Sequence, residues 1–387
     1  MSSIPTISTA VTTHTGVSLF RAPSAPSSLT FTLPQLAGSM ARAAALSKAP
    51  PAVVAALSRA YMEMLNGFVD AAHSDLTFLT DIEDLSDNLR TGFSGFFGAG
   101  MLDLYLSQLG YIFHCNGREL IPKGKVFDLA YDASTGTTGQ LIAAEAKGSI
   151  QGGATLAAIR SDAQAGYNSQ ITPHLGTTVH GATIVHGYAI GTGSQLKRGV
   201  CCEMHVQESS WVTGTAGSAP PTKPTTPVSA APPPTFQRPV GVVAVRHYRD
   251  VFRLLGTADL VGAIESALHA DWSFFKPSPV YTLGLTQWRG NQYAVAPQAG
   301  EAIRFGLRLD VAMSFLTGIA ACIRDRRIPA RFPEIPTRPE FAWGELLVQD
   351  GGAEFPDGLA YFGRSQPAME SARLVWNPEV GGPEYQS

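Results

Sequence analysis

Hydrophobic residues in the first third of the chain recur every three or four positions, the spacing of one face of a helix. This spacing predicts helices over residues 52–72 and 95–109. Gly110 follows the second helix, at a position where glycine commonly ends one. The spacing then changes to two, which is typical of β-strands. It predicts three short strands, over residues 111–115, 126–132 and 140–147.

The elements that follow complete an α/β pattern. A turn rich in glycine and threonine at residues 134–139 would join the last two strands as a hairpin. A helix is predicted over residues 154–170, and further strands over 182–190 and 201–207. The order helix, three strands, helix, two strands is typical of a central mixed sheet flanked by helices.

The two ends of the chain have other patterns. Residues 1–34 contain 14 Ser or Thr, one Arg and no acidic residue, and we interpret them as a disordered leader. Eight of the 27 residues from 213 to 239 are proline, which is typical of a linker or a long loop. Helical spacing resumes beyond this segment. It predicts three helices, over residues 240–255, 258–269 and 301–323.

Five regions follow from these patterns. They are the leader at 1–34, an N-terminal helical region at 35–90, an α/β core at 91–212, the proline-rich linker or loop at 213–239, and a mainly helical C-terminal region at 240–387.

The composition narrows the class of protein. Charged residues make up 15% of the chain, against about 25% in an average soluble domain. The net charge of −3 excludes a protein that coats nucleic acid through bulk positive charge. No apolar run reaches the roughly 18 residues of a membrane span, and four cysteines do not form a disulfide framework. We therefore expect a protein of the reducing cytoplasm with no membrane partner.

Three ionisable residues are predicted to converge on this sheet. Glu145 and Lys147 are two residues apart in one strand, so they share a face. A turn near Gly136 would place Asp128 opposite residue 144 or 145, at a Cβ distance of about 5 Å. The apolar residues 141–144 indicate an interior strand, where a charge is costly unless it is paired or binds a cation.

This group of residues suits phosphodiester hydrolysis. Two carboxylates with a backbone carbonyl and waters are suitable ligands for Mg²⁺ or Mn²⁺. A neighbouring lysine can hold a phosphate and orient or deprotonate a water molecule. The alternative is a structural Glu145–Lys147 ion pair on a solvated strand face.

These residues and the order of elements resemble the PD-(D/E)xK nuclease superfamily over about residues 90–210. The resemblance implies a restriction-endonuclease-like core in which Asp128 and Glu145 bind the metal and Lys147 is the catalytic lysine. It also implies DNA as the preferred substrate. The next helix contains Gln164, Tyr167 and Gln170, similar to the glutamine and tyrosine that some members place beside the site, and of these Gln164 is the candidate. Many members have a glutamate on the preceding helix, but the corresponding position here is Ala99, and Asp103 follows one turn later.

Other interpretations remain open at this stage. The chain could be a catalytically weakened nuclease fold that binds nucleic acid or protein, or an assembly protein with no metal dependence. A homodimer or a partner protein is compatible with either. Candidate cations for a nucleic-acid backbone are Arg246, Arg249, Arg253, Arg324, Arg326, Arg327 and Arg331. The histidines and cysteines of residues 174–205 lack the close pair spacing of a zinc site, so we interpret them as strand residues.

Overall fold

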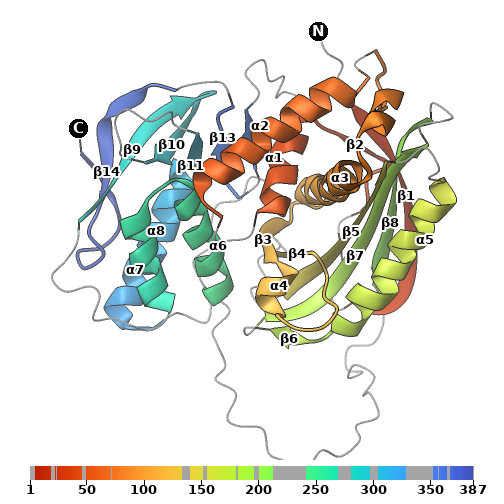
Figure 1. Ribbon diagram of the computed structural model, residues 1–387. Helices are drawn as coiled ribbons and strands as arrows, with labels where there is room; N and C mark the ends of the chain where they lie inside the picture. The colour runs from red at the N-terminus through yellow and green to blue at the C-terminus, as the bar shows by residue number, and fades with distance from the viewer. Residues whose placement is uncertain are drawn as a thin grey trace, which may run out of the picture.

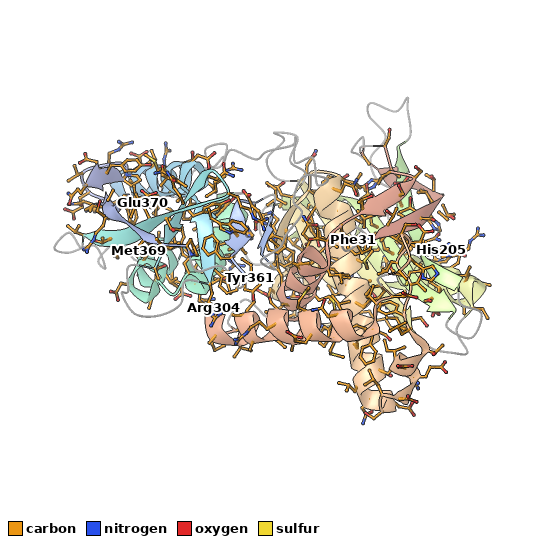
Figure 2. All side chains as sticks on the ribbon, turned by 90° about the horizontal axis from the view of Figure 1, so that it is seen from above. Phe31, His205, Arg304, Tyr361, Met369 and Glu370 are labelled. Atoms are coloured by element: carbon orange, nitrogen blue, oxygen red, sulfur yellow. The ribbon has the colours of Figure 1, made fainter. Side chains whose placement is uncertain are left out.

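The computed structural model contains two sheets, each with its own helices (Figure 1). It describes residues 5–18, 22, 24–45, 49–70, 72–132, 140–150, 155–179, 182–195, 200–211, 241–268, 280–296, 304–327, 352–355, 357–363 and 367–386. The predicted turn at 134–139 and the proline-rich segment at 213–239 lie outside these residues. Figure 2 shows the two units side by side, with Phe31 and His205 in the N-terminal unit and Met369 and Glu370 in the C-terminal unit.

The N-terminal unit is built on a mixed sheet. Its strands, in spatial order, are β2 (Ser28–Thr30), β1 (Thr6–Ser18), β8 (Val200–Trp211), β7 (Ala182–Gln195), β5 (Gln140–Ile150), β4 (Leu129–Asp132) and β3 (Ile112–Asn116), and β6 (Thr178–Val179) pairs with β7. The β1–β8 and β5–β7 pairs are parallel, whereas the other pairs are antiparallel. The α/β class and the five predicted core strands are confirmed.

The interpretation of residues 1–34 as a disordered leader was wrong. Residues 6–18 form β1, which pairs along β8, and Ile7 is fully buried. Burial of Ile7 and backbone pairing with a distant strand offset the chain entropy that a serine- and threonine-rich segment otherwise retains. The N-terminal segment is therefore part of the sheet.

Helices cover both faces of this sheet. The helices before the core strands are α1 (Leu33–Ala44), α2 (Pro51–Phe68) and α3 (Asp87–Gln108), with the 3₁₀ turn η1 (Thr80–Asp84) between the last two. On α1, the Thr32 hydroxyl accepts the Gln35 amide N–H while the Gln35 side chain accepts the Thr32 amide N–H, a reciprocal cap that fixes the start of the helix. The short α4 (Gly117–Leu120) follows β3. On the other face lie α5 (Leu156–Gly166), the π-helical turn η2 (Tyr167–Ile171) and the 3₁₀ turn η3 (Thr172–His174).

Two glycines let α3 approach strand β5 closely. A Cβ on Gly148 would lie 1.7 Å from the Ser94 carbonyl oxygen, and one on Gly98 would lie 2.6 Å from the Gly148 amide nitrogen. Because neighbouring strand residues point to opposite faces, Gly148 faces α3 while Lys147 faces α5. This packing fixes which side chains of β5 are available on the α5 face.

The C-terminal unit is an antiparallel sheet with three helices, so the prediction of a mainly helical region was wrong. Its strand order is β12 (Ala353–Glu354), β13 (Leu359–Tyr361), β11 (Phe305–Arg308), β10 (Asn291–Val295), β9 (Tyr281–Trp288), β14 (Met369–Trp376) and β15 (Glu384–Gln386). The helices α6 (Gly241–Leu254), α7 (Ala258–Leu268) and α8 (Leu309–Asp325) confirm three predicted helices, although α8 begins later because residues 305–308 form β11. Among the described helices, none has the length and apolar character needed to cross a bilayer.

A buried ion cluster joins the two units. Arg42 of α1 lies 3.1 Å from a carboxylate oxygen of Asp357, and His247 of α6 lies 3.0 Å from the same oxygen. Burial alone would raise the pKa of Asp357, but the charge of Arg42 and contact with His247 outweigh it and lower the pKa to about 2. The Arg42 guanidinium also lies 4.4 Å from the centroid of the Phe113 ring. This cluster fixes the C-terminal unit against α1 and β3.

The N-terminal strand can be tested with two substitutions on the same strand. Ile7→Ala removes a fully buried side chain, and we expect it to lower the free energy of unfolding by about 2–5 kcal/mol. Val11 is 40% exposed, so Val11→Ala should cost less than about 1 kcal/mol. Urea unfolding of both variants measures the difference. Two variants as stable as the wild type would show that residues 6–18 are not packed in the sheet.

Candidate active site

The candidate site is centred on β5. Leu141, Ile142, Ala143 and Ala144 are all buried, as expected for a strand with elements packed on both faces. Glu145 follows them directly, and its side chain is 1% exposed. Strand β5 pairs with β4 on one side and β7 on the other, so this carboxylate lies inside the sheet rather than at its edge.

Asp128 meets Glu145 from the neighbouring strand. Leu129 pairs with Ala144, which places Asp128 next to Glu145 as the sequence predicts. The Asp128 amide N–H donates to Glu145 Oε2 at 3.1 Å, and Asp128 Oδ2 accepts the Ala146 N–H at 2.9 Å. The two carboxylates are therefore held by the backbone of each other's strands.

Lys147 completes the group. Its ammonium forms an ion pair with Glu145 Oε1, and its side chain remains 36% exposed. Gly166 of α5 lies directly above, because a Cβ there would be 3.1 Å from Glu145 Cγ and 3.3 Å from Lys147 Cε. A larger residue at this position would press on both side chains. Glu145 is thus enclosed, while Asp128 and Lys147 face solvent.

The surroundings shift both carboxyl groups in the same direction. Burial, and then the charge of Asp128, raise the pKa of Glu145 to about 7, although Lys147 opposes the shift. Although part of Asp128 is exposed, desolvation by the packed residues around its carboxyl group raises its pKa, against the Ala146 hydrogen bond and the Lys147 charge. Two neighbouring acids, one of which has a pKa near 7, are typical of functional sites and also of structural ion networks.

The donor atoms suit a hard cation with water ligands. Among the described residues, no group of three or more His, Cys, Asp or Glu side chains is arranged to hold a metal. Mg²⁺ often binds through one or two carboxylates and keeps several waters, so the Asp128–Glu145 pair fits it. Such a pair does not meet the ligand number of a structural zinc site.

Gln170, rather than the predicted Gln164, contacts the site. Gln164 is exposed on α5, and its side chain makes no hydrogen bond to the described site residues. Gln170 lies in the π-helical turn η2, with Oε1 3.5 Å from Lys147 Nζ and Nε2 donating to the Val126 carbonyl at 3.0 Å. Gln170 follows Gly166 by four residues, so both lie on the helix face that packs on Glu145 and Lys147, whereas Gln164 is two residues before Gly166 and points away.

A polar group anchors this turn to the N-terminal strand. The Tyr167 ring stacks on His14 of β1 with centroids 4.2 Å apart, and its hydroxyl lies 2.6 Å from Ser209 Oγ. His14 Nε2 in turn lies 2.6 Å from Gln207 Oε1. His14 was not among the predicted site residues, because residues 1–34 have the composition of a disordered segment. A pairing signal for β1 would have been needed to find it.

Asp103 does not replace the acid that is missing at Ala99, because it does not reach the α5 face of the sheet. Asp103 of α3 is buried and accepts hydrogen bonds from Ser39 at 2.7 Å and Tyr131 at 2.8 Å. Tyr131 of β4 belongs to the same hydrophobic core cluster as Met101 and Tyr105 of α3, so it lies on the α3 face of the sheet. Asp103 therefore serves the α3 face and not the Asp128–Glu145 pair.

The arginine groups are largely engaged within the chain. Arg249 and Arg253 form ion pairs with Asp250 and Glu265, and Arg324 pairs with Asp325. Arg331 lies outside the described residues. Of the candidate cations on α6, Arg249 and Arg253 are thus neutralised by acids of α6 and α7.

A cavity at the joint between the two units is separate from this site. It encloses about 60 Å³, and its lining includes Arg42, His114, His247 and Asp357. None of Asp128, Glu145 and Lys147 lines it. In the candidate site, Asp128 is exposed and Lys147 is partly exposed at the surface, above the buried Glu145.

No known protein family, curated protein or solved structure matches this chain.

The raised pKa of Glu145 predicts a pH-dependent stability. An acid whose pKa is raised on folding destabilises the folded state as the pH rises from about 4.5 to about 7. Above pH 7 the ionised form should cost about 3 kcal/mol, and Glu145→Gln should remove most of this cost. We expect the variant to be more stable than the wild type at pH 8 in EDTA, and similar to it at pH 4.5. Urea unfolding measures the free energy of unfolding of both proteins. A difference between them that stays constant from pH 4.5 to pH 8 would contradict the raised pKa of Glu145.

Proposed function

We propose that this chain is a metal-dependent nuclease that hydrolyses phosphodiester bonds, with DNA as the preferred substrate. The observation that supports it most is the convergence of Asp128, Glu145 and Lys147 on one face of the sheet, with Glu145 buried and the other two open to solvent. A merely structural ion pair on a solvated face would not require a carboxylate inside the sheet.

The order of elements supports a restriction-endonuclease-like core. Helix α3 precedes β3, the strands β3, β4 and β5 are antiparallel in sequence, and α5 leads to β7, which runs parallel to β5. Asp128 lies directly before β4 and Glu145 lies in β5, next to the strand pair where the resemblance to PD-(D/E)xK nucleases expects them. This finer fold assignment and the superfamily membership are part of the proposal.

Each residue of the site has a chemical task in this proposal. Asp128 and Glu145 would hold Mg²⁺ or Mn²⁺, which supplies charge stabilisation and activation of water when it is bound. Lys147 places a positive charge, held by Glu145 and next to Gln170, where a phosphoryl oxygen can bind. Gln170 connects Lys147 to the backbone before Asp128 and so keeps the two strands' side chains in register.

A weakened nuclease fold that only binds nucleic acid is the second candidate. It is favoured by Ala99 and by Asp103, which faces the other side of the sheet and leaves the site with two carboxylates. This candidate predicts binding without cleavage.

Cleavage of supercoiled plasmid tests the proposal directly. With Mg²⁺ or Mn²⁺ we expect nicking that EDTA abolishes. The nicking rate should fall about 100-fold or more in Asp128→Asn, which loses a charge that holds the cation, and in Lys147→Ala, which loses the charge that binds the phosphoryl oxygen. Equal nicking by the wild type and both variants would refute the nuclease assignment. Metal-independent binding without nicking would favour the second candidate.

The two glutamines provide a matched pair of variants. Gln170→Ala removes the contact with Lys147, and we expect the cleavage rate to fall about tenfold. Gln164→Ala alters an exposed side chain on the preceding helix and should leave the rate unchanged. A larger loss in Gln164→Ala than in Gln170→Ala would show that the π-helical turn does not position Lys147.

A further inference from the structure

Exposed cations cluster in the segment that leads into Asp128. Arg118, Lys123 and Lys125 are all exposed, and the two lysines are among only seven in the chain. We call residues 118–125 the cationic loop. The acid in this segment, Glu119, lines the cavity at the joint between the two units rather than the candidate site.

Hydrogen bonds at several points hold the cationic loop in one shape. Arg118 Nη1 donates to the Gly124 carbonyl at 2.7 Å, and Gly124 has a φ of +85°, which favours glycine. His174 Nε2 donates to the Lys125 carbonyl at 2.9 Å. These bonds use backbone carbonyls, so the two ammonium groups are left to solvent.

The same contacts connect the cationic loop to the candidate site. Gln170 bonds the Val126 carbonyl and contacts Lys147, while His174, four residues further on, bonds Lys125. Lys125 is three residues before Asp128, a span of at most about 10 Å of extended chain. The backbone of Lys125 is therefore within about 10 Å of Asp128, and that of Lys123 within about 18 Å, a span of a few phosphates along a nucleic-acid strand.

We propose that the cationic loop binds the phosphate backbone of DNA next to the bond that the site cleaves. This inference rests on the proposed function. Duplex DNA has one negative charge for about every 1.7 Å of helix axis, so a cation within about 10 Å of the cleaved phosphate meets neighbouring phosphates. A chain with net charge −3 gains little attraction from its bulk charge, and local cations must supply the affinity. Because the cationic loop would contact DNA phosphates rather than bases, its contribution to the affinity does not depend on the DNA sequence.

Salt-dependent binding tests this surface separately from catalysis. Fluorescence anisotropy of a labelled DNA duplex, with Ca²⁺ in place of Mg²⁺, gives the affinity between about 50 and about 200 mM salt. For Lys123→Gln/Lys125→Gln we expect about tenfold weaker binding at the lower salt concentration. The slope of log affinity against log salt should shrink by about 2, since each lost phosphate contact removes about 0.9.

Two control variants make the result specific. Arg59→Gln removes one exposed charge from α2, outside the cationic loop, and should change neither affinity nor slope. Lys125→Arg keeps the charge and should bind like the wild type. An unchanged slope in the double variant, or a wild type that does not bind DNA at low salt, overturns the inference. Equal competition by polyglutamate at matched charge also overturns it, because it would indicate an acidic protein partner.

Failure of the proposed function gives a different result. If the plasmid is not cleaved but the double variant still loses affinity and slope, the cationic loop binds DNA and the nuclease assignment is wrong. If the plasmid is cleaved and the double variant binds and cleaves like the wild type, the nuclease assignment stands and the inference about the loop is wrong.

Discussion

The candidate site depends on one buried carboxylate. Glu145 is 1% exposed inside an apolar strand, and a charge in such a position is stable only with partners. It has two, the Asp128 amide N–H and the Lys147 ammonium. The partners impose the local structure, because β4 must pair with Leu129 opposite Ala144 and α5 must present a glycine at position 166. A shift of one residue in that pairing would turn Asp128 to the other face of the sheet.

The two faces of the N-terminal sheet have different roles. On the α3 face, Gly98 and Gly148 bring α3 and β5 so close that neither position has room for a side chain, and this contact holds β5 in place. On the α5 face, the strand presents its ionisable residues, and the turn after α5 is anchored through Tyr167 to His14 of β1. The N-terminal strand thus supports the site without contacting it. The buried Arg42–Asp357 pair fixes the C-terminal unit against α1 and β3.

Local patterns in the sequence predicted much of this arrangement. The spacing changes from that of a helix to that of a strand after Gly110, and this change predicted β3, β4 and β5 close to their observed positions. Alternation along β5 placed Glu145 and Lys147 on one face.

The missed elements depend on distant partners. Strand β1 has few apolar residues and pairs with β8 about 195 residues away, which no local pattern records. Strand β11 ends at Arg308 and α8 begins at Leu309, so no connecting segment marks the boundary, and residues 305–308 were included in the predicted helix. Gln164 lies two residues before Gly166, the residue that packs on Glu145 and Lys147, so it points away from the site. Gln170 follows Gly166 by one helical turn and contacts Lys147.

Calorimetric titration with Mn²⁺ at pH 7 tests the central claim most directly, because it measures the cation site without requiring a nucleic-acid substrate. Since the pKa of Glu145 is about 7, part of the Glu145 population is protonated at this pH and must release its proton when a cation binds. We predict one Mn²⁺ per chain with proton release, detected as a dependence of the binding heat on the buffer, and loss of this binding in Asp128→Asn. Absence of binding at millimolar Mn²⁺, or equal binding by the wild type and Asp128→Asn, would contradict the account.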